Sequence, residues 1–205
     1  MVKLAALSAS VAAAALVGSL WYESQPRSGD PFQTCRASAI AGGSAQIGGP
    51  FTLVNARGQT VTDADVLTEP SLVYFGYTFC PDICPLDTVR NADAVDILDA
   101  AGHNVTPVFI SVDPNRDTPE VVGDFAANIH DRMVGLTGTS EQVKAAAQAY
   151  RAYYKSQRQD DEYYLVDHST FSYLVLPEHG FVEFFRREVT PDAMADAVAC
   201  FIDAA

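Results

Sequence analysis

The chain has 205 residues, of which 48% are hydrophobic and 19% are charged, a composition typical of a folded protein rather than a disordered or fibrous one. The length suits one domain of about 150 residues with a tail at one end. Acidic residues outnumber Lys and Arg by 26 to 13, and the formal net charge of −13 excludes nucleic-acid binding, because that function needs a cationic surface to displace phosphate counterions.

Residues 4–22 carry no charge and are predicted to form a membrane segment. As a helix with about 1.5 Å rise per residue, this run is roughly 28 Å long, close to the hydrocarbon thickness of a bilayer. Lys3 precedes the run and Glu23 follows it, so the positive-inside bias exports the rest of the chain. We favour a retained anchor over a cleaved signal, because the run exceeds the usual signal core, although Val17 and Ser19 would suit a signal peptidase. Either way, the cysteines enter an oxidising compartment.

Residues 23–49 lack periodicity and are rich in Gly, Ser and Pro, which is typical of a linker that lifts a domain off the membrane. The domain is expected to occupy residues 50–205. Its first element is a predicted β-hairpin, with strands at 51–55 and 59–62. Uninterrupted apolar runs of strand length follow, and they predict strands that are buried on both faces, at 71–77 and 105–112.

Four helices are predicted from apolar positions three or four residues apart and from residues that start or stop a helix. Gly102 ends the first of them. Thr118 and Ser140 are the expected N-caps of the second and third, and Thr190 with Pro191 opens the last. Further strands, the last two of them joined by a turn, are expected at 133–136, 163–166, 171–176 and 181–186.

The predicted order is a hairpin, β-α-β-α, a short strand, a helix and then ββα. A βαβ unit followed by a ββα unit is the arrangement of the thioredoxin fold, and an early hairpin is a common addition to it. The sequence therefore predicts an α/β, thioredoxin-like fold with an N-terminal β-hairpin extension, preceded by a single transmembrane segment.

Two of the four cysteines, Cys80 and Cys84, stand between a predicted buried strand and a predicted helix. Thiols four residues apart at a helix start lie on one face, with Cα atoms about 6 Å apart, which is within reach of a disulfide. The positive end of the helix dipole lowers the pKa of a thiol and favours the thiolate. The pair can therefore act as redox-active thiols or hold a soft cation.

A third ligand would separate these two possibilities. His103, His130 and His179 follow a helix-ending glycine, end a helix or occupy a turn, and are expected to be solvated or capping residues. His168 stands between two predicted strands, in a loop that this fold would bring over the first helix. Two thiolates and one imidazole form a soft, low-coordinate set suited to copper, above all Cu(I), whereas a structural zinc site would want a fourth protein ligand.

The chain resembles a known family in three segments, which read FCPDICP at 79–85, SVDPNRDTP at 111–119 and VDHSTFSYLVLP at 166–177. From about residue 49 to the C-terminus it is similar to the Sco/SenC family of membrane-anchored, thioredoxin-fold copper chaperones for cytochrome c oxidase assembly. The resemblance implies that Cys80, Cys84 and His168 are copper ligands. Asp113 lies in a matching loop and is assigned no ligand role.

The resemblance also implies a function, a partner and a location. The family delivers copper, as Cu(I) or Cu(II), to the binuclear centre of the oxidase subunit that receives electrons from cytochrome c. We therefore expect that copper-receiving subunit as partner, a bacterial inner-membrane location with the soluble domain facing the periplasm, and membrane contact through residues 4–22. A disulfide between Cys80 and Cys84 would abolish metal binding, so copper loading should require prior reduction.

The alternative function is a thiol–disulfide oxidoreductase that reduces the cysteines of the copper-receiving partner. The spacing of Cys80 and Cys84 allows it, although thioredoxin-type enzymes use Cys-x-x-Cys, one residue shorter, and need no histidine opposite. A peroxiredoxin is disfavoured because Tyr77 stands where that family has a threonine, three residues before the cysteine. We therefore expect a metallochaperone rather than an enzyme, with thiol reduction as a possible second activity.

The other two cysteines, Cys35 and Cys200, are expected to form a structural disulfide, because the domain is exported and these thiols are left over. The crosslink would close a loop of 165 residues. A loop of that size contributes on the order of 4–5 kcal/mol to stability, less any strain. The alternative is two unpaired cysteines, with Cys200 as a small buried apolar residue.

Overall fold

The structure is a computed structural model that describes residues 30–36, 47–157 and 163–205. The chain divides into two units, 1–33 and 34–205, and every helix and strand below belongs to the second. Within the described part of the chain, no helix is both long and apolar enough to cross a membrane. The predicted membrane segment and most of the predicted linker lie outside the described residues, so their boundaries stay predictions.

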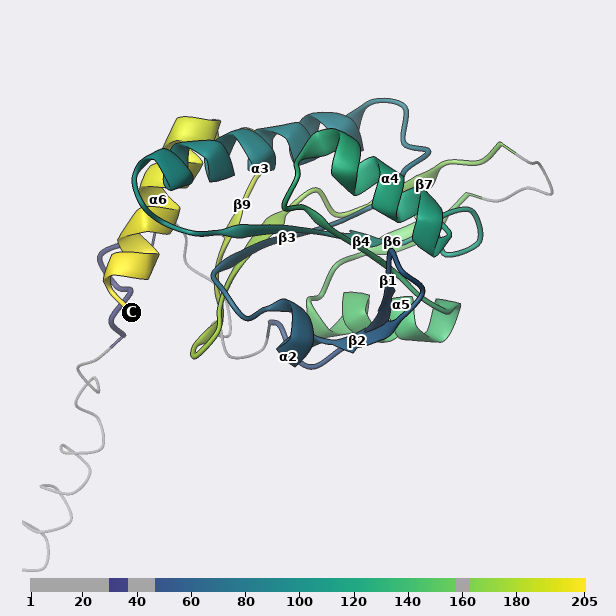
Figure 1. Ribbon diagram of the computed structural model, residues 1–205, viewed down its shortest axis with the longest axis horizontal. Helices are drawn as coiled ribbons and strands as arrows, with labels where there is room; N and C mark the ends of the chain where they lie inside the picture. The colour runs from purple at the N-terminus through teal and green to yellow at the C-terminus, as the bar shows by residue number, and fades with distance from the viewer. Residues whose placement is uncertain (1–29, 37–46, 158–162) are drawn as a thin grey trace, which may run out of the picture. The chain divides into compact units, whose positions relative to one another are not determined.

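Nine strands form two sheets in the described residues (Figure 1). The larger sheet has the order β2-β1-β5-β4-β3-β8-β9, and the smaller one pairs β6 with β7. Strand β3 is parallel to β4, and β4 to β5, whereas β8 is antiparallel to both β3 and β9. The strands are β1 Thr52–Asn55, β2 Thr60–Thr62, β3 Ser71–Gly76, β4 Thr106–Ser111, β5 Val134–Thr137, β6 Tyr154–Ser156, β7 Val166–His168, β8 Ser172–Leu176 and β9 Gly180–Phe185.

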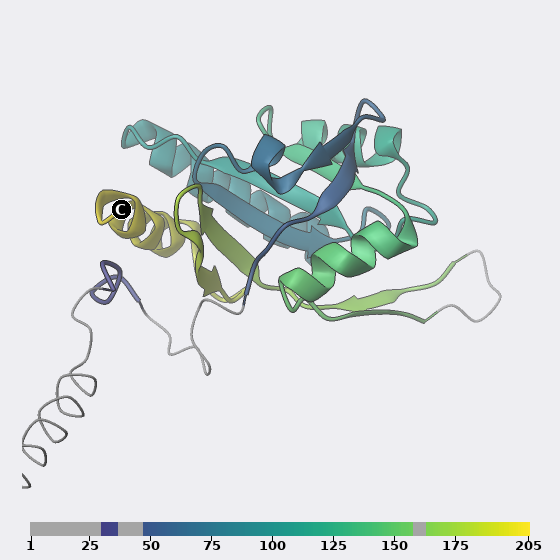
Figure 2. The same ribbon diagram turned by 90° about the horizontal axis from the view of Figure 1, so that it is seen from below.

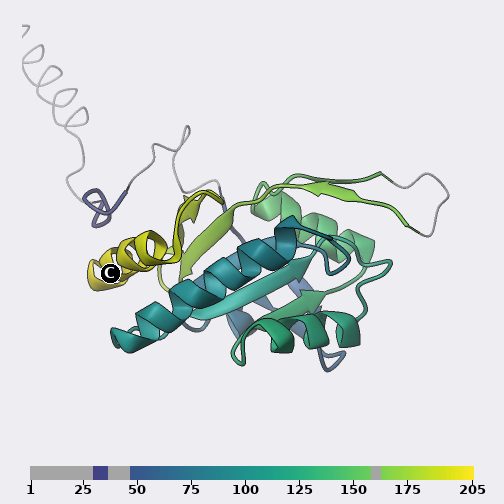
Figure 3. The same cartoon turned by 90° about the horizontal axis from the view of Figure 1, so that it is seen from above.

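Helices cover both faces of the larger sheet. Figures 1 and 3 show α3, α4 and α6 on one face, and Figure 2 shows α5 on the other. The helices are α2 Asp63–Val66, α3 Ile83–Ala100, α4 Pro119–Ile129, α5 Ser140–Ala149 and α6 Pro191–Asp203. The predicted βαβ and ββα units are therefore present as β3-α3-β4 and β8-β9-α6, and the fold is the thioredoxin-like α/β fold that the sequence predicts.

The centre of the sheet explains the uninterrupted apolar runs. Every residue of β3 is buried, because β4 and β8 flank it and helices lie over both faces. Three aromatic side chains meet there, and Phe75 lies 5.4 Å from Tyr150 and 5.9 Å from Tyr173 between ring centroids. The early hairpin is also confirmed, since β1 pairs antiparallel with β2 and Leu53 is fully buried.

Helix ends follow the sequence signals, with one correction. Thr118 and Thr190 accept hydrogen bonds from the backbone N–H groups three residues on, as N-caps do. The third predicted cap is wrong: Thr139, not Ser140, caps α5. Thr139 is the cap because Gln142 stands three residues later. The Gln142 side-chain oxygen accepts a hydrogen bond from the Thr139 N–H, which completes a capping box.

A second correction concerns the segment that carries His168. The predicted strand at 163–166 is wrong; strand β7 covers Val166–His168 and pairs antiparallel with β6, with Tyr154 opposite His168. Neither strand pairs with the larger sheet, and Figure 2 shows the two strands as a ribbon running out beyond its edge. His168 is thus the last residue of a strand and not part of a loop.

Candidate metal centre

The two cysteines of the site lie at the start of α3: Cys80 precedes the helix, and Cys84 lies in its first turn. Strand β3 ends at Gly76, and the Cys80 N–H donates to the Tyr77 carbonyl, 3.3 Å away, in the turn before the helix. Asp82 occupies the N-cap position, but its side chain caps nothing. Instead the Cys80 Sγ accepts the Cys84 backbone N–H at 3.3 Å. A sulfur atom therefore satisfies one of the free amides of this helix start.

The sulfur of Cys84 is placed deep, against the end of β3. Cys84 is fully buried, whereas Cys80 keeps 8% of its surface exposed. A Cβ atom at Gly76 would lie 3.1 Å from the Cys84 Sγ and 2.8 Å from the Tyr74 ring. Gly76 is needed here because any side chain would displace the sulfur or the ring.

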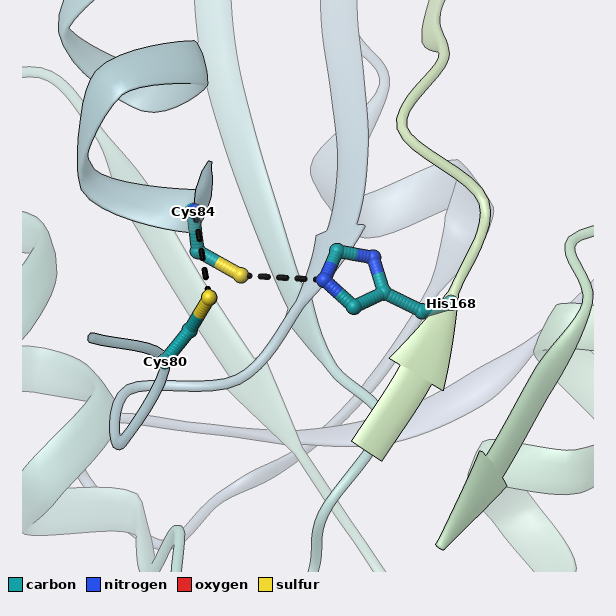
Figure 4. Close-up of side chains that lie close together, drawn as sticks. All are labelled: Cys80, Cys84 and His168. Atoms are coloured by element: carbon teal, nitrogen blue, oxygen red, sulfur yellow. Dashed lines mark hydrogen bonds between the residues drawn. The ribbon is translucent and has the colours of Figure 1, made fainter. Parts of the chain in front are cut away.

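His168 reaches the sulfurs from β7 (Figure 4). Its Nε2 lies 3.1 Å from the Cys84 Sγ, and its Nδ1 lies 2.8 Å from the Ser169 carbonyl oxygen. A carbonyl oxygen only accepts, so Nδ1 carries the proton and the lone pair of Nε2 faces the sulfurs. The edges of the Tyr74 and Tyr77 rings hold the imidazole, with centroids 6.1 and 5.7 Å away.

The two thiols ionise very differently. A hydrogen bond from the Cys84 thiol, helped by the backbone amides of Asp82 and Cys84, lowers the pKa of Cys80 to about 4. The same bond together with burial raises the pKa of Cys84 far above its usual range. At neutral pH the pair is therefore one thiolate and one thiol. Helix amides contribute as the sequence predicts, but the partner thiol contributes most.

The three side chains can share one metal ion. Their donor atoms all lie within 4.8 Å of one another, and both cysteines are unpaired. Bonds of about 2.0–2.3 Å from nitrogen and sulfur to one ion would need only small side-chain shifts from this arrangement. Within the described residues, no other group of His, Cys, Asp and Glu gathers in this way.

The remaining histidines lie away from the cysteines. The His103 Nε2 lies 3.9 Å from an Asp203 carboxylate oxygen, and the His130 Nε2 lies 3.2 Å from Asp96. His130 is also the C-cap of α4, which agrees with the expectation that these histidines are solvated or capping residues. His179 occupies the turn between β8 and β9. Two soft sulfurs and a single imidazole thus form the complete donor set that the described chain provides here.

Two pockets, of about 340 and 310 Å³, share lining residues next to Cys80. Cys80 and His168 line one pocket, Arg116 lines the other, and Pro81 and Leu165 line both. Six large apolar side chains are exposed in the described residues, and three of them, Phe79, Tyr163 and Leu165, line these pockets; the others are Leu86, Val89 and Tyr153. Such a concentration of exposed apolar side chains is typical of a surface that contacts another molecule.

Behind Cys84 lies a buried polar network that sequence reasoning missed. The Tyr74 hydroxyl donates to Asp87 at 3.0 Å, and Arg90 lies 3.6 Å from the other oxygen of that carboxylate. The Arg90 guanidinium also donates to the Ser172 hydroxyl at 2.9 Å. The signal available was the run of polar residues in the first turns of α3, whose apolar periodicity begins only at Ala94.

The other cysteine pair lies far along the chain from this site. A disulfide joins Cys35 to Cys200 on α6, with Cα atoms 5.7 Å apart. Arg36, next to Cys35, donates to the Val182 carbonyl and lies over the Phe201 ring, 5.9 Å from its centroid. The segment around Cys35 is therefore held to α6 and β9 by both covalent and polar contacts.

Comparison with known proteins places this site in a family. The sequence model of the SCO1/SenC family matches residues 40–203. The chain belongs to the SCO1/SenC family. It is 54% identical over 203 residues to Protein SenC of Rhodobacter capsulatus, covering 98% of this chain and 91% of that one. The mitochondrial SCO1 homolog 1 of Arabidopsis thaliana is 43% identical over 157 residues, 76% of this chain and 47% of its own length, so the chain spans about half of that relative.

Solved structures of the family share the fold. The crystal structure of Arabidopsis thaliana ScoI with copper bound has 41% identity and a TM-score of 0.72, covering 77% of this chain and 99% of that one. BsSco, described as a member of the Sco family of cytochrome c oxidase assembly proteins with a disulfide switch, has 29% identity and a TM-score of 0.58, covering 74% and 91%. One of these relatives is thus described with copper bound and the other as a cytochrome c oxidase assembly protein.

Proposed function

We propose that this SCO1/SenC protein is a copper chaperone that binds copper through Cys80, Cys84 and His168 and delivers it to the copper-receiving subunit of cytochrome c oxidase. The observation that carries the proposal is the convergence of two sulfurs and one deprotonated imidazole nitrogen within 4.8 Å. Soft thiolate ligands with an imidazole favour copper, and relatives with copper bound support the same assignment.

The ionisation of the pair suits loading and release. Cys80 is already a thiolate, so the site attracts a cation while Cys84 still carries its proton. Binding by Cys84 then displaces its thiol proton, because only the thiolate is a strong metal ligand. The affinity for copper should therefore rise with pH. Oxidation of the two thiols to a disulfide removes both sulfur ligands, and loading requires the dithiol.

Delivery is favoured by the shape of the site. Cys84 is fully buried and Cys80 reaches the surface, so a ligand from a partner can approach on the Cys80 side. The exposed Phe79 and Leu165 flank that approach and offer apolar contact to the partner. We further propose that residues 4–22 anchor the protein in a bacterial inner membrane, with the domain on the periplasmic side.

A thiol–disulfide oxidoreductase is the second candidate, and the low pKa of Cys80 favours it. A thiolate that keeps 8% of its surface exposed, beside a fully buried thiol, is the arrangement of a nucleophile and its resolving partner. In this function the Cys80 thiolate attacks the partner's disulfide, and Cys84 then displaces the reduced partner to leave a Cys80–Cys84 disulfide. His168 is dispensable for that exchange, whereas it is required for a three-ligand copper site.

Copper titration of the reduced full-length protein tests the proposal. We expect one copper per chain, no tight binding in Cys84→Ser, and a loss of affinity in His168→Ala beyond the roughly 10–100-fold typical of losing an outer-shell partner. His130→Ala is the matched control, because that imidazole pairs with Asp96 and should leave copper affinity unchanged. Wild-type affinity in His168→Ala, with dithiol reductase activity retained, would replace the chaperone assignment by the oxidoreductase.

A further inference from the structure

The geometry points to Arg116 as a positioning residue that clamps the His168 ribbon to the cysteine loop and so sets the geometry of the metal site. His168 belongs to the two-stranded ribbon β6–β7, which forms no ladder with the larger sheet. Cys80 and Cys84 belong to the other half of the site, at the end of β3 and the start of α3. Contacts other than strand pairing must therefore fix the distance between imidazole and sulfurs.

Arg116 contacts the segment that precedes each half. Its guanidinium carbon lies 3.7 Å from the centroid of the Tyr164 ring, four residues before His168. It also lies 4.9 Å from the Phe79 ring, immediately before Cys80, and 5.7 Å from the Tyr77 ring. A planar cation stacked on aromatic faces joins them without needing a hydrogen bond to each.

Asp113 makes the same connection through hydrogen bonds. One carboxylate oxygen accepts the Tyr164 hydroxyl at 2.7 Å, and the other accepts the Arg116 Nε at 2.5 Å. Asp113 is 3% exposed, so this bridge forms away from water, where charge-assisted bonds are strong. Asp113 thus acts on the ribbon and the arginine and supplies no metal ligand.

The loop that carries these two residues is itself fixed to the cysteine loop. Asp117 is fully buried and accepts hydrogen bonds from the Thr78 N–H at 3.0 Å, the Thr78 hydroxyl at 2.6 Å and the Ser111 hydroxyl at 2.5 Å. The Ser111 hydroxyl in turn accepts the Asp113 N–H at 3.0 Å. Residues 111–117 therefore link the segment before Cys80 to the segment before His168.

A clamp differs from general structural support in what it predicts for the copper site. If Arg116 acts through His168, its removal weakens copper binding only while His168 is a ligand. If it merely supports the fold, the loss is the same with or without His168. A double-mutant cycle between the two residues separates the two cases, because coupling energy appears only where the residues act together.

The experiment measures Cu(I) affinity of the reduced full-length protein by competition with a chromogenic chelator, in wild-type and His168→Ala backgrounds. Arg116→Gln should weaken binding about 10–100-fold in the first background and less than about 3-fold in the second. Tyr164→Phe, which keeps the ring and removes only the hydroxyl, should give about a 2–10-fold loss in the first background alone. Arg132→Gln, which breaks a surface pair with Asp99, is the matched control and should change nothing.

A second readout needs no metal. In the copper-free protein, amides of residues 164–169 should exchange about 10-fold faster in Arg116→Gln, as expected when a hydrogen bond to a charged group is lost, while amides of β3 keep their rates. Equal affinity losses in the two backgrounds, or unchanged exchange in the ribbon, would overturn the clamp. The copper readout rests on the proposed function, and failure of that function appears separately, as absent copper binding in the wild type.

Discussion

The chain holds two cysteine pairs in opposite chemical states. Cys35 and Cys200 are joined, although 165 residues separate them, whereas Cys80 and Cys84 remain free thiols four residues apart. The joined pair is half-buried, with Cys35 in the short segment that ends at residue 36 and Cys200 on α6. The free pair sits at a helix start, beside an imidazole. Residue type and compartment are common to both, so the surroundings must account for the difference.

The surroundings of Cys80 stabilise a thiolate, and this changes the chemistry of its pair. A backbone N–H and a neighbouring thiol donate to its sulfur, so its pKa falls to about 4. A thiol of low pKa is also a good leaving group, so a Cys80–Cys84 disulfide should be readily reduced. Near Cys35 and Cys200, the described contacts run from Arg36 to the Val182 carbonyl and the Phe201 ring. These contacts hold the Cys35 segment in place and donate no hydrogen bond to a sulfur.

The largest expected effect comes from oxidising Cys80 and Cys84, so that they are joined as Cys35 and Cys200 are. Oxidation of Cys80 and Cys84 to a disulfide should abolish copper binding completely, because both sulfur ligands are consumed. The measurement is copper stoichiometry before and after a mild oxidant, with free thiols counted on denatured, unreduced protein. Two free thiols should fall to none. Four free thiols at the start would contradict the Cys35–Cys200 crosslink, and undiminished copper after oxidation would contradict the ligand set.

Removing the structural pair should have a large effect on stability and none on the site. The double variant Cys35→Ser/Cys200→Ser should lose on the order of 4–5 kcal/mol of unfolding free energy, less any strain in the native crosslink. Denaturant unfolding measures this loss, and copper titration should give wild-type affinity. Cys80→Ser/Cys84→Ser is the matched control, expected to lose copper and keep the crosslink. A weakened copper site in the first variant would mean that the two pairs are coupled.

The two pairs can also be compared through pH. Cys80 should react with iodoacetamide at a rate that is nearly constant from pH 6 to 8 and falls as pH approaches about 4, whereas a thiol in the unfolded chain titrates near about 8.5. Between these values the unfolded chain binds more protons, so folding stability should rise with pH. Above about pH 8.5, folding stability should instead fall as pH rises, because the unfolded chain releases the Cys84 proton that the folded chain retains. A rate that instead rises through pH 8.5 would mean an ordinary thiol.

Much of the fold could be predicted because its signals are local. The buried runs of β3 and β4 and the glycine that ends α3 at Gly102, with a φ of 89°, need only neighbouring residues. The cap of α5 was also readable, since Thr139 and Gln142 have capping-box spacing. Strand β6 was not, because its three residues, Tyr154–Ser156, are half-buried or exposed and show no alternation of apolar and polar side chains.

The site divides in the same way. The nearness of Cys80 and Cys84 follows from helix geometry, and the placement of His168 near them could be inferred from the order of the elements. The roles of Arg116 and Tyr164 could not, because 48 residues of chain separate them and only the folded ribbon brings ring and guanidinium together. Asp87 was missed for a related reason: its partner Tyr74 lies on β3, so the bond exists only after helix and strand have packed.

The smallest predicted effect concerns Arg36, whose contacts hold the segment next to the Cys35–Cys200 disulfide. Arg36→Ala removes the bond to the Val182 carbonyl and the contact with Phe201, and should cost about 1–2 kcal/mol of unfolding free energy in the disulfide-bonded protein. In Cys35→Ser/Cys200→Ser the same change should cost less than about 0.5 kcal/mol, because the released segment then makes these contacts only part of the time. Denaturant unfolding of the four variants measures the difference. An equal cost in both backgrounds would mean that Arg36 holds the segment by itself, and that the crosslink acts on the unfolded chain alone.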